Sequence, residues 1–251
     1  MSADLVQRRD DGPIARLTLD DPEHANVLSL AMIEALDARI AEAAGDDAVR
    51  VVVLDAAGKV FCAGHDLGEM RAIEDPTGHE RLFNRCAALM QSIGASPKPV
   101  IAKVRRAAVA AGCQLVASCD LAFAAEGARF AVSGINLGLF CSTPSVALTR
   151  VIGEKAALEM LLTGRFVGAA EAASLGLINR AVPDADLDRV VDETAAAIAG
   201  KCPEAVALGK ALFRRQLELG VADAYTLASR KMAENMTFSG AKASIDSFLS
   251  R

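Results

Sequence analysis

Several features that often identify a function are missing from this chain of 251 residues. None of its six cysteines forms a C-x-x-C pair, and its three histidines, His24, His65 and His79, stand in no recognisable metal-binding spacing. These absences predict reduced thiols without disulfides and no metal site. The cysteines are Cys62, Cys86, Cys113, Cys119, Cys141 and Cys202.

Long apolar runs are also absent. No run reaches the roughly 20 residues that a transmembrane helix needs, and the first residues, MSADLVQRRDDG, lack the apolar core of a signal peptide. We therefore expect no membrane span and a cytoplasmic location. The net charge of −5 is modest and both signs are interleaved, so neither nucleic acid nor an anionic membrane surface is an expected partner.

What the chain does contain is a regular alternation of strand and helix patterns. Strands are predicted over 14–20, 49–55, 100–104 and 121–125, and helices over 28–44, 81–93 and 112–118. Ser29 is a plausible N-cap for the first helix. Strands that alternate with helices predict an α/β core with buried parallel pairing.

The pattern changes after Pro144, where helix follows helix with one short strand near 177–182. From Asp184 onward the pattern is nearly all helical. We predict one core over residues 1–183 and a helical C-terminal region over residues 184–251. The amphipathic spacing of that region predicts packing against partner subunits.

Two segments each end a buried strand with small residues and then begin a helix. They are VVVLDAAGKVFCAGHDL (51–67) and VIAKVRRAAVAAGCQL (100–115). Small side chains beside a helix start let a ligand approach bare backbone N–H groups, and two converging N–H groups are what an oxyanion needs. Small residues before helices also serve close packing, so composition alone leaves both interpretations open.

Specific strings favour the oxyanion interpretation. FCAGHDL, AAGCQLVASCDLAFAAEGARF and LGLFCSTP follow one another and resemble the crotonase superfamily, the enoyl-CoA hydratase/isomerase family. The similarity extends from DDPEHANVLSL near Asp21 to VIGEKAALEMLLTGRFVGAAEAASLGLINRAVP, which ends at Pro183. It therefore covers nearly the whole chain in order.

The resemblance implies a crotonase-like spiral of ββα units whose helical C-terminal region assembles homotrimers, or hexamers made of two trimers. It implies an acyl-CoA thioester as substrate, with coenzyme A as part of that substrate and no permanently bound cofactor. The thioester oxygen would accept hydrogen bonds from the backbone N–H groups of His65 and Ala111. A catalytic role for the His65 imidazole is the alternative interpretation of that residue.

Contacts to coenzyme A also follow from the resemblance. They map onto His24, Ala25 and the loop from Ala63 to Leu67, which contains His65 and Asp66. Asp66 is in addition a candidate N-cap for the helix that follows it. The ending IDSFLSR resembles a family tail in which Phe248 and Arg251 would reach the nucleotide, although a terminal arginine is also often a solvated chain end.

The chain departs from the hydratase pattern at both acidic positions. Family members that hydrate an enoyl-CoA use two glutamates, and here Gln114 and Gly134 align with them. An amide can orient water or a substrate oxygen, or can be a satisfied buried polar group, but it cannot act as a base. The nearest polar replacements are Ser133, Asn136, Cys141 and Ser142, and for the cysteine inert packing is favoured over nucleophilic attack.

A second departure lies before the second loop, where Arg105 and Arg106 replace the asparagine and glycine that are common in the family. This replacement puts the geometry of that loop in doubt. Two functions follow from the departures. In the first, the protein polarises a thioester for enolate chemistry such as decarboxylation. The similarity of AGHDL to methylmalonyl-CoA decarboxylases adds slight support to this function. In the second, the protein binds acyl-CoA with little turnover. A hydratase-type name would still fit the fold.

Overall fold

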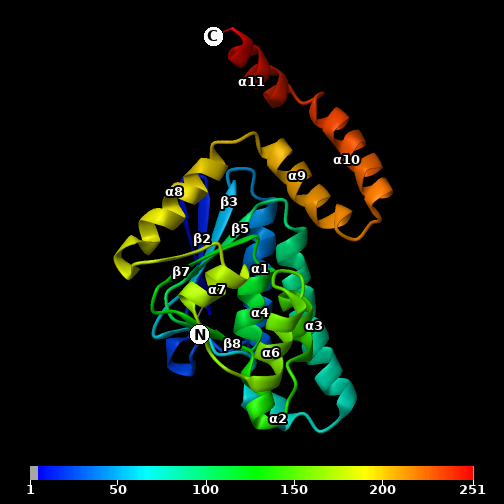
Figure 1. The fold of residues 1–251 in the computed structure, drawn as a ribbon. Coiled ribbons are helices and arrows are strands. Elements are labelled where there is room, and N and C mark those ends of the chain that lie inside the picture. Colours follow the sequence, from blue (N-terminus) through cyan, green and yellow to red (C-terminus); the bar gives the residue numbers. More distant parts are fainter. Residues whose placement is uncertain (1–4, 251) are drawn as a thin grey trace.

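The computed structural model describes residues 5–250 and contains two β-sheets with helices packed around them (Figure 1). The strands are β1 (Val6–Asp11), β2 (Ile14–Leu19), β3 (Val51–Ala56), β4 (Val60–Cys62), β5 (Val100–Val104), β6 (Ala107–Val109), β7 (Leu121–Ala125), β8 (Arg129–Ala131), β9 (Val167–Gly168) and β10 (Arg180–Val182). The helices are α1 (Leu30–Gly45), α2 (Leu67–Ala72), α3 (Pro76–Ala95), α4 (Ala111–Ser118), α5 (Ser142–Leu148), α6 (Glu154–Thr163), α7 (Ala169–Leu175), α8 (Leu187–Ala199), α9 (Pro203–Gln216), α10 (Val221–Asn235) and α11 (Ser239–Leu249). Single 3₁₀ turns are η1 (Pro22–His24), η2 (Ser133–Leu137) and η3 (Asp184–Asp186).

Successive strand pairs build both sheets. The larger sheet has the order β1-β2-β3-β5-β7-β10, with β1 antiparallel to β2 and the other pairs parallel. The smaller sheet has the order β4-β6-β8-β9, in which β9 is antiparallel to β8. Each of the pairs β3/β4, β5/β6 and β7/β8 places its first strand in the larger sheet and its second in the smaller one. The predicted α/β spiral of ββα units is therefore confirmed.

The larger sheet is buried on both faces, which explains why its strands are continuous apolar runs. On one face α8 packs through Leu187 and Val191 against strand residues that include Val51 and Ile101. The other face carries the main core, to which α1, α3 and α4 contribute (Figure 1). Within this core α4 packs against α3 and against β4 and β6 of the smaller sheet.

The two predicted N-caps, Ser29 and Asp66, are confirmed. Ser29 Oγ accepts a hydrogen bond from the N–H of Met32 at the start of α1, and Asp66 Oδ1 accepts hydrogen bonds from the N–H groups of Gly68 and Glu69 at the start of α2. The helix predicted over 81–93 begins earlier, at Pro76. Proline suits the first helical turn because its missing N–H needs no acceptor there.

Several strands differ from the predicted pattern. The strand predicted over 177–182 is limited to Arg180–Val182, because residues 177–179 form a turn whose Asn179 side chain accepts a hydrogen bond from the N–H of Ala122. The strands β1, β4, β6, β8 and β9 are additional, and all except β1 have only two or three residues. Such short strands carry too little periodicity to be recognised in a sequence.

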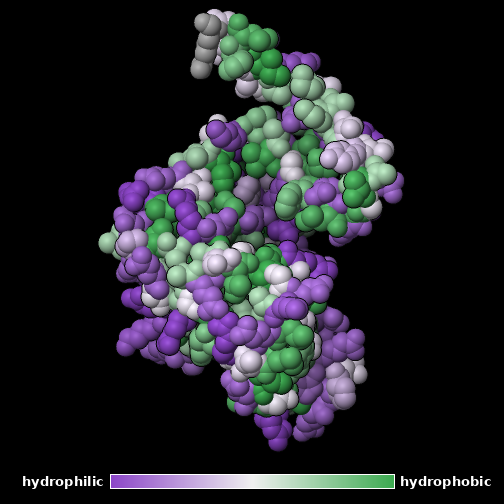
Figure 2. Space-filling model, in the orientation of Figure 1, coloured by the Kyte–Doolittle hydropathy of each residue, from purple (hydrophilic) through white to green (hydrophobic). Residues whose placement is uncertain are grey.

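The helices α9, α10 and α11 form an arm that projects from the body and ends at the C-terminus (Figure 1). Its root is held by Lys210, whose ammonium lies 2.6 Å from Asp120 and donates hydrogen bonds to the carbonyl oxygens of Ile93 and Lys98. Arg214 adds a 2.8 Å ion pair to the same aspartate. Beyond this root the arm exposes apolar side chains, seen as green atoms in Figure 2.

Two further observations concern the described part of the chain. None of the helices within residues 5–250 has the length and apolar character required to cross a membrane. All six cysteines are free thiols, and five of them are buried. The division of the chain at residue 183 stays a prediction, although α8, which follows it, packs directly on the larger sheet.

Candidate active site

The two loops predicted to bind an anion meet in space. The first connects β4 to α2 through Gly64, and the second connects β6 to α4 through Ala110. A Cβ atom at Gly64 would lie 2.9 Å from the methyl carbon of Ala110 and 3.3 Å from the backbone nitrogen of Ala111. Gly64 also has a φ of +99°, which favours glycine. The absence of a side chain here lets the two loops touch.

Each loop presents a backbone N–H group without an acceptor. Within residues 5–250, neither the N–H of His65 nor that of Ala111 donates a hydrogen bond to another group of the chain. Backbone N–H groups that make no bond within a folded chain are free to bind a ligand or water, and here two of them come from residues that line one cavity. Two such donors on neighbouring loops have the arrangement that a developing oxyanion needs.

Backbone strain aims the second of these N–H groups. Ala110 has φ 50° and ψ −117°, a conformation that favours glycine, and it is the residue before the first turn of α4. Its own N–H donates a 2.8 Å hydrogen bond to the carbonyl oxygen of Ala131 in β8. The surrounding structure therefore holds a strained residue in place and turns the next N–H outward.

Arg105 and Arg106, which the sequence indicated could alter the second loop, direct their side chains toward acidic residues outside it. The Arg105 guanidinium lies 3.0 Å from Asp184 and 2.8 Å from Asp188, and Arg106 Nη1 lies 3.8 Å from Asp184. Both arginines are thus drawn toward η3 and the start of α8. After them β6 pairs in regular parallel register with β8, its pairing with β4 contains a register shift between Val60 and Cys62, and α4 begins at Ala111.

A cavity of about 630 Å³ opens beside the two N–H groups. Ala63, His65, Asp66 and Leu67 of the first loop form one wall, and Ala110 and Ala111 of the second loop form another. The remaining walls come from α2, from α3, from η1 and the residues after it, and from the segment between η2 and the start of α5. The wall residues that sequence reasoning missed are Val27, Gly68, Met70, Phe83, Leu137, Leu139, Phe140, Thr143 and Pro144. Most are apolar, which suits an acyl chain.

Gln114 is close to this cavity in sequence but is not one of its wall residues. Its side chain is 4% exposed within α4, and its Oε1 has no hydrogen-bond partner among residues 5–250. The interpretation of Gln114 as a group that orients substrate in the cavity therefore has no support from this geometry. The alternative, a buried amide with all its hydrogen bonds satisfied, stays a prediction, and among the described residues Oε1 has no hydrogen-bond donor.

Gly134 lines the cavity, but the space of a side chain there is filled. A Cβ atom at this position would lie 2.6 Å from the carbonyl oxygen of Leu139 and 2.9 Å from the sulfur of Cys141. The N–H of Gly134 donates a 3.4 Å hydrogen bond to that sulfur. The chain segment that follows η2 therefore folds over the place where a second acid would project.

Cys141 is packed rather than activated. Its side chain is buried, and burial raises the pKa of its thiol despite the opposing hydrogen bond from Gly134. A nucleophilic cysteine needs a lowered pKa and a partner base, and Cys141 has neither among the described residues. Its contact with Gly134 supports inert packing.

The predicted coenzyme A contacts fall into two groups. His24 lies at the cavity mouth, where Asp21 Oδ1 is 2.8 Å from His24 Nδ1 and this hydrogen bond raises the pKa of the imidazole. Ala25 follows it with a φ of 54°. Phe248, by contrast, lies on α11 at the far end of the arm, 73% exposed and away from the cavity of its own chain (Figure 1). Arg251 lies outside the described residues.

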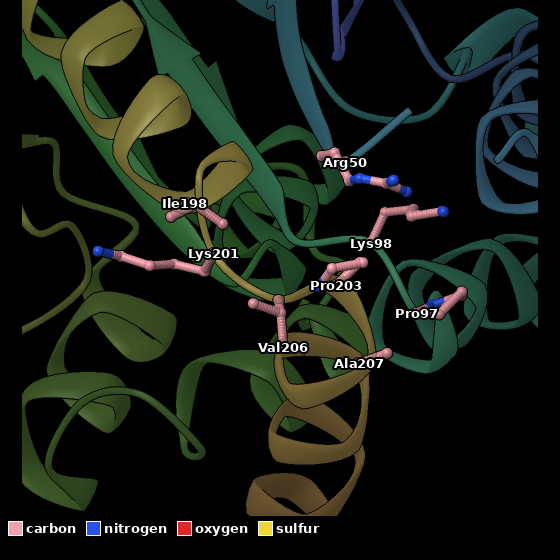
Figure 3. Close-up of a pocket in the computed structure, with 8 residues that line it drawn as sticks. All are labelled: Arg50, Pro97, Lys98, Ile198, Lys201, Pro203, Val206 and Ala207. Atoms are coloured by element: carbon pink, nitrogen blue, oxygen red, sulfur yellow. The ribbon is translucent and has the colours of Figure 1, made fainter. Parts of the chain in front are cut away.

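A second, much smaller hollow has a volume of about 40 Å³. It lies between the residues that precede β3 and β5 on one side and the segment that connects α8 to α9 on the other. Arg50, Lys98 and Lys201 line it, but Figure 3 shows their charged ends directed away from the hollow rather than into it. Arg50 instead donates a hydrogen bond to the carbonyl oxygen of Asp47. This hollow therefore lacks the converging donors of an anion site.

No cluster of three potential metal ligands occurs within the described part of the chain.

Comparisons with known proteins agree with this architecture. The sequence matches the family described as "Enoyl-CoA hydratase/isomerase" over residues 9–251. The Xenopus laevis protein "Enoyl-CoA hydratase domain-containing protein 3, mitochondrial" is 43% identical over 238 residues, 95% of this chain and 81% of that protein. A solved enoyl-CoA hydratase structure from Mycobacterium smegmatis is 51% identical with a TM-score of 0.96, and the match covers 98% of this chain and 96% of that one. The solved human enoyl-CoA hydratase domain-containing protein 3 has a TM-score of 0.96 at 41% identity, covering 98% and 97%.

Proposed function

This chain belongs to the enoyl-CoA hydratase/isomerase family, and on that premise we propose that it is an acyl-CoA enzyme that stabilises a thioester enolate. The observation that carries the proposal is the pair of adjacent backbone N–H groups, of His65 and Ala111, that have no acceptor among the described residues. Both residues line the same cavity, whose apolar walls can receive an acyl chain. Coenzyme A would enter as part of the substrate, with His24 and Ala25 at the mouth.

The cavity walls favour enolate chemistry over hydration. Hydration needs a group that activates water and a group that moves a proton, and the two positions of the hydratase glutamates hold Gln114 and Gly134. Asp66 is the one carboxylate of the cavity wall, and its Oδ1 accepts hydrogen bonds from the N–H groups of Gly68 and Glu69. Decarboxylation of a malonyl-type thioester forms the enolate without removal of a proton. It therefore needs no carboxylate base, and we propose it ahead of hydration as the reaction.

We propose further that the protein assembles as a homotrimer or as a dimer of trimers. Its arm exposes a long series of apolar side chains that a monomer would leave in water. An acyl-CoA bound by such an assembly could meet Phe248 and Arg251 from a partner subunit. The exposed apolar residues of the arm are Phe213, Leu217, Val221, Tyr225, Met232, Met236, Ile245, Phe248 and Leu249.

A screen of diverse acyl-CoA thioesters, read by mass spectrometry for both binding and product, tests the function. Turnover of a malonyl-type thioester to its decarboxylated product is the expected result. Binding without any product would favour the acyl-CoA binding protein, and failure of all thioesters to bind would refute both. A complex structure should place the thioester oxygen about 2.7–3.1 Å from the N–H nitrogens of His65 and Ala111.

A further inference from the structure

The loss of both hydratase acids leaves the question of which side chain could move a proton in this cavity. Four titratable residues line its walls: His24, His65, Asp66 and Cys141. Asp66 is held as the cap of α2, and the Cys141 sulfur is packed against Gly134. His24 is exposed at the mouth and paired with Asp21. His65 is the one member of this set whose side chain makes no hydrogen bond or ion pair with another described residue.

The position of the His65 ring suits a proton-transfer group. Its Nε2 is buried without a hydrogen-bond partner within residues 5–250, whereas Nδ1 is not buried and equally has no partner there. The edge of the ring packs against Phe83 of α3, with ring centroids 5.4 Å apart. A contact with an aromatic ring fixes the imidazole without occupying its free nitrogen, so Nδ1 remains available to a ligand in the cavity.

The ring belongs to the same residue whose N–H would hold the thioester oxygen. The α-carbon of an acyl thioester is separated from that oxygen only by the carbonyl carbon. A substrate held by the N–H groups of His65 and Ala111 would therefore have its α-carbon in the cavity that His65 itself lines. Proximity of this kind is a large part of what an enzyme contributes to a proton transfer.

We propose that the His65 imidazole is the proton-transfer group at the substrate α-carbon, an inference that rests on the proposed function. In the step, the α-carbon–hydrogen bond breaks and its electron pair moves into the enolate, which places negative charge on the thioester oxygen. The proton goes to Nδ1 and gives an imidazolium. In a decarboxylation the carbon–carbon bond breaks, its electron pair forms the enolate and carbon dioxide leaves. Nδ1 takes up a proton from solvent, and the resulting imidazolium passes that proton to the same carbon and becomes neutral again.

The environment favours the neutral form of the imidazole, which is the form that can accept a proton. Burial lowers the pKa of His65, so the neutral form predominates above that lowered value. Charged groups on the neighbouring elements are engaged elsewhere: Asp66 caps α2, and Glu69 accepts a hydrogen bond from the N–H of Leu30. On α3, the His79 ring stacks on Phe83 with centroids 6.4 Å apart, and its two ring nitrogens lie within hydrogen-bond distance of the carbonyl oxygens of Asp75 and Met70.

The test is exchange of the α-protons of butyryl-CoA in deuterated water, followed by mass spectrometry. Wild-type protein should incorporate deuterium, and His65→Ala and His65→Gln should lose about 100-fold or more of the exchange rate. Both variants keep the backbone N–H, so their affinity for butyryl-CoA should remain close to that of the wild type. His79→Gln, which alters the neighbouring histidine outside the cavity, is the matched control and should keep its exchange.

Two readouts separate proton transfer from a structural role. The wild-type exchange rate should rise with pH and level off, with an apparent pKa below the ordinary histidine value of about 6.5, because only the neutral ring accepts a proton. Added imidazole should restore part of the exchange in His65→Ala. The inference is overturned if wild-type protein binds butyryl-CoA without exchange, or if either His65 variant exchanges at the wild-type rate. Wild-type protein that binds no acyl-CoA would overturn the proposed function as well.

Discussion

Gly64 and Ala110 are in such close contact that a Cβ atom added at Gly64 would lie 2.9 Å from the Ala110 methyl carbon. This contact brings the N–H groups of His65 and Ala111 together from two separate loops. Gly64→Ala should therefore force the loops apart, and its φ of +99° adds strain. We expect loss of at least about 100-fold in turnover of any acyl-CoA substrate, the scale seen when one oxyanion donor is removed.

Steady-state kinetics with the substrate found in the screen measure this effect. Gly127→Ala is the control, because Gly127 has no positive φ and a Cβ there meets nothing within 4 Å. It should turn over substrate as the wild type does. Equal activity of Gly64→Ala and wild type would show that loop contact is not needed for the site.

Ala110→Gly should stabilise the protein. The alanine holds φ 50° and ψ −117°, which costs of the order of 1–3 kcal/mol for a residue with a Cβ, and glycine removes most of that strain. Glycine also makes the unfolded chain more flexible, which offsets part of this gain. We therefore expect the free energy of unfolding, measured by urea denaturation, to rise by about 1 kcal/mol.

Ala117→Gly, inside α4, is the comparison, and its free energy of unfolding should fall by about 1 kcal/mol or more. A fall in Ala110→Gly would contradict the strain argument.

Much of this site could be predicted from sequence because its signals are local. Ser29 and Asp66 precede helices and cap them, and the FCAGHDL and AAGCQL strings mark the two loops. The filled space at Gly134 could not be predicted, since it depends on how Leu139 and Cys141 fold back after η2. The position of Phe83 in the cavity wall was also missed, because the sequence of an amphipathic helix does not show which cavity its apolar side chains line. Arg105 reaches Asp184, 79 positions away, and sequence spacing gives no hint of that pairing.

The protein should be a poor hydratase. A positioned acid or base contributes about 10²–10⁴-fold, so crotonyl-CoA hydration should lie at least several hundred-fold below that of a two-glutamate relative. The Gln114→Glu, Gly134→Glu double variant should fail to recover it, because the Gly134 substitution meets the Leu139 carbonyl oxygen at 2.6 Å. Hydration is followed by the loss of enoyl absorbance. Wild-type turnover at the level of ordinary hydratases would refute the prediction.

Four thiols should resist alkylation in the folded protein. Burial raises the pKa of Cys62, Cys86, Cys113 and Cys119 to about 12 in each case. The thiolate is the reactive form, and at pH 8 a group with that pKa is almost entirely protonated. Iodoacetamide at pH 8, with peptide mapping, should leave these four unlabelled until denaturant is added, while the partly exposed Cys202 serves as the internal comparison. Rapid labelling of the four would mean that the core opens readily.

The assembly should depend on the apolar face of α10. Tyr225 and Met232 are each 72% exposed and, being seven residues apart, lie on the same side of the helix. Replacing both with glutamate should shift sedimentation toward a monomer, since buried charge without a partner is costly. Arg230→Glu changes the charge on the opposite side of α10 and should leave the assembly intact. A wild-type monomer at micromolar concentration would contradict the proposed assembly itself.

The short helix α4 is held at both ends by different parts of the molecule. Its first residue, Ala111, carries one of the two free N–H groups, and its C-terminal end is bound by the arm: Arg214 donates a hydrogen bond to the carbonyl oxygen of Ser118 and pairs with Asp120. Eight residues of helix span roughly 12 Å, too short a length to bend. The seat of the arm and the N–H of Ala111 are therefore two ends of one short helix, so a change in how α9 packs acts on the same element that presents this N–H group.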